Sequence, residues 1–248
     1  MERIDGLAFA RCNAINNPAF LPDGLRTMEM NVFFRSTSFS SLTIPATVEC
    51  MEGNPAYMSA CKEYQVAEGN PYFMALDSCI YATTGRTTLP VGTVHDPWQP
   101  AEGAIPTALV GVPSARVNTE LVVPEGVTTV CNQAARAVPL TEIHLPSTLT
   151  VVRKMAFTGI STLTQVTCLA TVPPTMEESS FTGDAFSATL RVPIGSLEAY
   201  RTAPIWKNFQ NIEGIDTGNE PVRGDLNGDG KTDVSDVNAL INIILTKN

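Results

Sequence analysis

Basic residues and histidines are scarce in this sequence. Its 248 residues include 16 Lys and Arg against 25 Asp and Glu, and only two His, for a net charge of −9. Binding to nucleic acid or an anionic membrane surface requires basic patches, so we expect neither partner. No run of 18 or more apolar residues occurs, and residues 1–6 contain no apolar stretch of the signal-peptide kind. We therefore expect no membrane span and no signal peptide in this chain.

Motifs of catalytic chemistry are also missing. No Ser or Cys stands in a nucleophile motif such as G-x-S-x-G, and no phosphate-binding glycine loop occurs. His95 lies next to Asp96 and close to Trp98, but without a nucleophile this favours packing or ligand binding over catalysis. His144 alternates with apolar neighbours, which predicts a solvent-facing histidine on a strand. We predict that the protein is not an enzyme.

The six cysteines contain no C-x-x-C pair. They stand at positions 12, 50, 61, 79, 131 and 168, and neither histidine has a cysteine at zinc-ligand spacing. The even number leaves three disulfides open as an alternative. We favour buried free thiols.

A repeat of 22 residues organises most of the chain. Pro124 and Pro146 are 22 positions apart, as are Ala134 and Ala156, and each pair belongs to the same unit. The unit consists of a short apolar strand, a Pro, a turn, two further apolar positions and Ala followed by a small or aromatic residue. One unit cannot bury its apolar row alone, so we expect the units to stack into a continuous sheet around an apolar ladder. An ordinary β-sandwich is the alternative.

This pattern resembles the BspA-like leucine-rich repeats of bacterial surface proteins. The resemblance implies an α+β leucine-rich-repeat solenoid over residues 1–214, with a hairpin insertion after Val66 and an irregular insertion near 84–117. It also implies a closing unit in which Ser196 caps a short helix. The predicted strands are 25–30, 41–45, 63–67, 120–123, 141–145, 163–168 and 189–192. Short helical turns are expected near 132–137, 153–158 and 196–202.

The last 25 residues carry the most specific motif. Oxygen-bearing side chains fall at positions 1, 3, 5, 9 and 12 of a loop that has a glycine, Gly230, at position 6; position 7 would offer its backbone carbonyl. This spacing is that of a Ca²⁺ loop. The predicted metal ligands are Asp225, Asn227, Asp229, Lys231 (through its carbonyl), Asp233 and Asp236.

An apolar stripe at helical spacing follows this loop and predicts a helix over 236–245. Pro221 and Gly224 argue against a helix before the loop, so the motif is half of an EF-hand. It resembles a single type I dockerin repeat, which implies Ca²⁺ as the cofactor and a cohesin-like domain as one candidate partner. The domain prediction is therefore a solenoid over 1–214, a linker over 215–223 and a dockerin-like segment over 224–248.

Two functions remain open from the sequence. The first is a non-catalytic, secreted or cell-surface binding or adhesion protein, whose repeat surface holds a host or microbial protein or glycan. The second is a component of a calcium-dependent assembly that docks through its dockerin-like tail.

Overall fold

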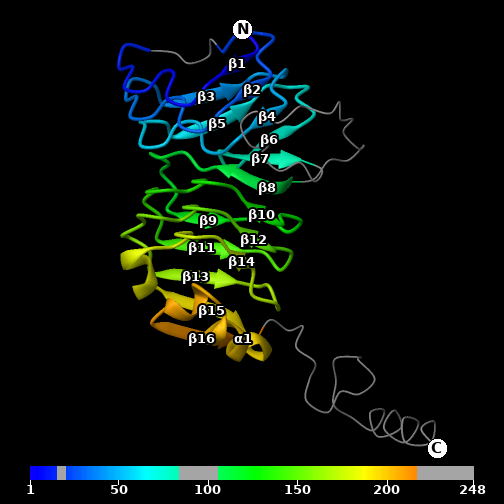
Figure 1. The fold of residues 1–248 in the computed structure, drawn as a ribbon, viewed down its shortest axis with the longest axis vertical. Coiled ribbons are helices and arrows are strands. Elements are labelled where there is room, and N and C mark those ends of the chain that lie inside the picture. Colours follow the sequence, from blue (N-terminus) through cyan, green and yellow to red (C-terminus); the bar gives the residue numbers. More distant parts are fainter. Residues whose placement is uncertain (16–20, 84–105, 217–248) are drawn as a thin grey trace, which may run out of the picture.

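The described part of the chain is a solenoid of stacked coils. In a computed structural model, residues 1–15, 21–83 and 106–216 can be described. The coils follow one another along the long axis of the molecule, from the N-terminal coil to a closing unit near residue 215 (Figure 1). The predicted calcium loop and the helix over 236–245 lie outside the described residues.

From residue 41 onward, the repeated coils contribute longer strands to one side of the stack. These strands pair in parallel in two groups, β3 with β5, and then β9, β11, β13, β15 and β16 in one five-stranded sheet. Their bounds are Ser41–Ile44 (β3), Glu63–Val66 (β5), Glu120–Val122 (β9), Glu142–Leu145 (β11), Gln165–Cys168 (β13), Thr189–Pro193 (β15) and Asn211–Ile215 (β16). Six strands were predicted from residue 41 onward, and all six are confirmed. They are β3, β5, β9, β11, β13 and β15.

Shorter strands form the other side of the stack. Two-residue strands pair in parallel as β1, β2 and β4, and as β10, β12 and β14. Their bounds are Arg3–Ile4 (β1), Thr27–Met28 (β2), Cys50–Met51 (β4), Thr129–Val130 (β10), Val151–Val152 (β12) and Thr175–Met176 (β14). Of these, only β2 falls within a predicted strand, at 25–30.

An apolar ladder fills the space between the two sides. On the five-stranded sheet, Leu121, Ile143, Val166 and Leu190 stand in register on adjacent strands and are fully buried. Their sequence neighbours on the same strands face outward, as the alternation of a strand requires. The predicted ladder of stacked apolar positions is therefore confirmed.

The turns that close the coils differ from the predicted helical turns. In the turn over 131–138, alternate N–H groups bond within the turn and to the next coil: Ala134 donates to the Cys131 carbonyl, whereas Ala135 donates to that of Ala156 at 2.8 Å. Gln133 and Ala137 have positive φ angles of 54° and 51°. A left-handed residue every fourth position prevents the i→i−4 bonding of a helix. The helical turns predicted near 132–137 and 153–158 are therefore wrong.

An antiparallel excursion interrupts the repeat after β5. The strands β6 (Phe73–Leu76) and β7 (Cys79–Thr83) form the predicted hairpin, and β8 (Pro106–Gly111) pairs antiparallel with β7 and parallel with β10. The irregular insertion predicted near 84–117 therefore contains a buried regular strand. Residues 84–105 lie outside the described residues, as do His95, Asp96 and Trp98.

Asn54 joins the coils on either side of this excursion. Its buried amide donates to the carbonyls of Val112 at 2.8 Å and Ala134 at 3.0 Å. Its Oδ1 accepts from the Ala56 N–H and from the Tyr64 hydroxyl, the latter at 2.6 Å. One side chain thus replaces the backbone bonds that link successive turns elsewhere in the stack.

A compact closing unit covers the C-terminal end of the stack. It contains η2 (Gly183–Ser187), η3 (Ile194–Ser196), α1 (Leu197–Thr202) and η4 (Trp206–Asn208). Trp206 is fully buried, meets Tyr200 edge to face at 5.1 Å and donates from Nε1 to the Pro174 carbonyl. The helical turn predicted near 196–202 is confirmed, but Ser196 does not cap it, because its hydroxyl donates to the Thr171 carbonyl at 2.6 Å.

Helices are few among the described residues. The one α-helix found there, α1, has six residues, so the α+β prediction overstates the helical content of this part. Within the same residues, no helix has the length and apolar character needed to cross a bilayer.

Replacing Asn54 tests the junction of the two halves. We expect Asn54→Ala to lower the free energy of unfolding by at least about 3 kcal/mol, because it removes the partner of three buried groups, at about 1–3 kcal/mol each. These are the Val112 carbonyl, the Ala56 N–H and the Tyr64 hydroxyl. Urea denaturation measures the loss. Asn211→Ala, on the exposed sheet edge, is the matched control and should cost no more than about 0.5 kcal/mol. Equal costs for the two variants would contradict the bridging role.

Replacing Phe157 tests the apolar interior. This ring is fully buried and stacks on Phe181 with 4.9 Å between the centroids. We expect Phe157→Ala to cost about 3–5 kcal/mol by leaving a cavity. Val172, which is 76% exposed, provides the control, and Val172→Ala should change stability little. A thermal or urea transition of Phe157→Ala unchanged from the parent would show that the ladder is assigned to the wrong residues.

Candidate functional site

The outer face of the five-stranded sheet is polar and continuous. One row in strand register runs through Glu120, Glu142, Gln165, Thr189 and Asn211. The second row runs through Val122, His144, Thr167, Arg191 and Glu213, and all of these except the exposed Val122 are polar. These positions alternate with the buried ladder, so the same strands that build the core also present this surface.

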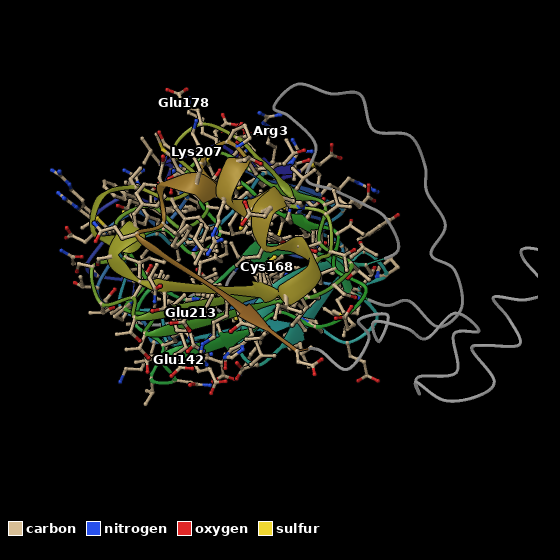
Figure 2. All side chains as sticks on the ribbon, turned by 90° about the horizontal axis from the view of Figure 1, so that it is seen from below. Arg3, Glu142, Cys168, Glu178, Lys207 and Glu213 are labelled. Atoms are coloured by element: carbon tan, nitrogen blue, oxygen red, sulfur yellow. The ribbon has the colours of Figure 1, made fainter. Side chains whose placement is uncertain are left out.

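The two rows lie on one side of the coil. Figure 2, viewed along the stack, shows Glu142 and Glu213 on the outer side of the sheet, with Cys168 inside the coil and Glu178 on the opposite side. The Arg191 guanidinium Nε lies 3.6 Å from a Glu213 carboxylate oxygen. Half-exposed ion pairs of this kind contribute little to stability, so these charges remain available to a partner.

His144 stands between two carboxylates on this face. Its Nε2 lies 3.2 Å from an oxygen of Glu120 and 3.6 Å from one of Glu142. Ile143 and Leu145 on either side of it are buried, so the predicted outward orientation of His144 is confirmed. The sequence reasoning missed the two glutamates, although Glu120 and Glu142 are separated by the 22-residue repeat, which places them side by side.

Among the described residues, Glu120, Glu142 and His144 form the cluster of side chains whose oxygen and nitrogen atoms could hold a cation. The three donor atoms lie within 4.8 Å of one another. The same three side chains lie on the exposed sheet face, and all of them are partly exposed. The cluster therefore supports polar recognition on the sheet face and does not by itself define a metal centre.

The cysteines are free thiols, and most of them are buried. All six are free, and Cys61, Cys79, Cys131 and Cys168 are buried. Burial raises the pKa of Cys61 and of Cys79 to about 12, and that of Cys168 to about 11. Because the thiolate is the nucleophile, these groups stay protonated and inert at neutral pH. The prediction of free thiols is confirmed, and that of burial holds for four of the six.

The adjacent glutamates after β14 do not form a catalytic pair. Glu177 accepts from the Arg153 guanidinium at 3.2 Å and from the Lys154 N–H at 3.1 Å. Glu178 points to the Lys154 ammonium at 3.8 Å. Their carboxylates thus serve separate partners on the surface, as expected for a solvated pair.

The predicted calcium ligands cannot be placed on this surface. All of them, Asp225, Asn227, Asp229, Lys231, Asp233 and Asp236, lie outside the described residues, and so does most of the predicted linker at 215–223.

Comparison with solved structures supports the fold. A leucine-rich repeat protein from Eubacterium ventriosum superposes with a TM-score of 0.52 at 19% identity, over 70% of this chain and 41% of that one. A leucine rich cell surface protein from Faecalibacterium prausnitzii aligns over 86% of this chain and 55% of that one at 16% identity, with a TM-score of 0.49. The chain therefore spans about half the length of these proteins. No curated protein matches it.

The repeat itself has a known sequence signature. The BspA type leucine rich repeat region matches in six copies, over residues 1–73 and 116–197. The unmatched stretch between these segments holds β7 and β8, where the antiparallel excursion interrupts the stack. The repeat signature covers more than half of the chain, and the stacked, in-register strands are those of a repeat solenoid. The chain belongs to the BspA-type leucine-rich repeat family.

Proposed function

We propose that this chain is a non-catalytic binding protein of the bacterial cell surface, which holds a protein or glycan partner on the outer face of the five-stranded sheet. The observation that supports this proposal is the row of polar side chains that crosses all five strands, beside a second row that is polar on four of them. Five strands at about 4.8 Å spacing give a surface about 19 Å across. A rigid surface of this kind suits recognition of a macromolecule.

The chemistry of the described residues favours binding over catalysis. The polar rows contain carboxylates, amides and hydroxyls around His144, but the nearest thiol on the same strands, Cys168, is buried and protonated. A nucleophile within hydrogen-bond reach of the imidazole would be the mark of an active site. The family supports a location at the cell surface, because the chain carries BspA type leucine rich repeats and these resemble repeats of bacterial surface proteins.

A calcium-dependent assembly through residues 224–248 is the second candidate. The observation that favours it is in the sequence, where every ligand position of the Ca²⁺ loop is filled between Asp225 and Asp236. In this proposal the solenoid is the cargo and the dockerin-like tail docks onto a cohesin-like domain.

Charge reversal on the sheet face tests the first proposal. The chain is screened against extracellular-matrix proteins and glycans, and the ligands found are titrated against the double variant Glu142→Lys, Glu213→Lys. We expect affinity to fall at least about tenfold, because reversed charges oppose a partner matched to the native face. Glu178→Lys, on the opposite side of the coil (Figure 2), should bind like the parent chain. Retained affinity in the double variant would assign the binding surface elsewhere.

Calcium titration tests the second proposal. We expect the full chain to bind one Ca²⁺ in a calorimetric titration and to lose this binding in Asp225→Asn, Asp236→Asn, because both changes remove carboxylate ligands. Asp184→Asn, a change within the solenoid, is the control for lost charge. Capture by a cohesin domain with Ca²⁺ but not with chelator would support assembly. Absence of Ca²⁺ binding by the parent chain would remove this candidate.

A further inference from the structure

The described arginines divide into two groups by their partners. Six have a carboxylate within ion-pair distance, namely Arg3, Arg26, Arg116, Arg153, Arg191 and Arg201. Arg11, Arg35 and Arg136 have none among the described residues. In a chain with a net charge of −9, carboxylates are plentiful, so three unpaired guanidinium groups require an explanation.

The three unpaired arginines share one edge of the solenoid. Arg11 and Arg35 occupy the turns of successive coils, and the Arg11 N–H donates to the Phe34 carbonyl at 2.7 Å. Arg136 belongs to the turn of a later coil, which the excursion between β5 and β9 brings next to Tyr57. This row of stacked turns, which we call the turn edge, is separate from the outer face of the five-stranded sheet.

Aromatic rings hold two of these guanidinium groups in place. Arg35 lies over the Phe34 ring at 5.1 Å and Arg136 over the Tyr57 ring at 4.6 Å, and the two rings stack on each other at 5.6 Å. Such contacts position a guanidinium group through its face and leave N–H donors at its edge for a ligand. Arg136 uses one of these donors on Gln133, at 3.0 Å.

A cavity of about 260 Å³ opens between these side chains. Arg35 and Arg136 both line it, together with Leu7 and Met58, which are 56% and 41% exposed. Asn31 also lines it, and its Oδ1 is buried without a hydrogen-bond partner. The cavity thus combines two fixed cations, apolar walls and an acceptor that lacks a donor.

We propose that this cavity binds an acidic sugar residue of a glycan. The guanidinium groups of Arg35 and Arg136 pair with its carboxylate or sulfate. Ring C–H groups pack on Leu7 and Met58, and a ring hydroxyl donates to Asn31 Oδ1. The volume falls below the range of about 300–1,000 Å³ for drug-sized ligands, which suits a single ring.

An extended acidic peptide fits this edge less well. Peptides commonly bind by adding a strand to unpaired backbone groups. Here the N–H groups of Phe33 and Arg35 already donate to the carbonyls of Pro55 and Tyr57 in the next coil. The turn edge therefore offers side chains and not a free strand edge, and recognition of a compact anionic ring is favoured.

This inference rests on the proposed function in treating the chain as a binding protein, but it assigns a different surface. Titration of the full chain tests it with three probes: a tetrasaccharide of alternating glucuronic acid and N-acetylglucosamine, a heparin hexasaccharide, and neutral tetra-N-acetylchitotetraose. We expect binding to at least one acidic probe and none to the neutral one. The first acidic probe reports a carboxylate, and the heparin probe tests whether sulfate also serves.

Variants locate the site. Arg35→Gln and Arg136→Gln should each weaken binding at least about tenfold, because each removes a charge-assisted hydrogen bond. Arg136→Lys should also weaken it, since an ammonium lacks the planar fork. Arg26→Gln, which removes an arginine paired with Glu49, is the matched control and should bind like the parent.

The outcomes separate the two proposals. The sheet-face variant Glu142→Lys, Glu213→Lys should keep its affinity for the acidic sugar. No binding of either acidic probe, unchanged affinity in both Gln variants, or equal binding of a hexaglutamate peptide would overturn the inference. Binding of other ligands to the sheet face would stand in each of those cases.

Discussion

Hydrogen bonding between coils is the constraint on which this fold depends. In each repeated turn about half of the N–H groups donate to the next coil, as Gln133, Ala135 and Ala137 do to Lys154, Ala156 and Thr158. The turn reaches this arrangement only by placing non-glycine residues in the left-handed region, at about 1–2 kcal/mol each. A helix would satisfy the same groups internally and would leave successive coils without hydrogen bonds in this turn. The backbone strain of the left-handed residues therefore accompanies the hydrogen bonds between coils.

The excursion between β5 and β9 shows how strictly the stack must satisfy its polar groups. After Tyr57 the next repeated turn along the chain is that of residues 131–138, far away in sequence. Asn54 donates to the carbonyls of Val112 and Ala134, the second of which also accepts from the Val112 N–H. Ser114 accepts from the Met58 N–H at 2.9 Å. The apolar ladder alone does not determine this junction, because an apolar residue at position 54 would fill space but leave the Val112 carbonyl without its donor.

The sequence predicts the longer strands well because each carries enough signal. A strand such as β11 combines alternation with a following proline, Pro146, and both features recur after 22 residues. The two-residue strands of the other side have no periodicity to detect. β8 was missed because Pro106, Gly111 and Pro113 flank its apolar run and suggest a loop, although its last four residues are buried.

The candidate surfaces depend on the stacking to different degrees. The contact of Glu120 with Glu142 follows from the repeat length, so the sequence holds that information once the register is known. The contact of Arg136 with Tyr57 does not, because these residues are joined only by the path of the excursion. Residues such as Gln133 and Met155 carry no sequence signal for a left-handed turn, since their side chains do not favour that conformation.

The distribution of charge separates the two surfaces physically. On the sheet face, the Arg191 guanidinium lies beside the Glu213 carboxylate, so its charge is balanced by a neighbour of opposite sign. On the turn edge, Arg35 and Arg136 meet aromatic rings, which fix a guanidinium group without neutralising it. A solenoid permits this division because each coil presents the same positions to the same side. A single repeat thus builds a balanced polar face and, a few residues further along, an edge with uncompensated positive charge.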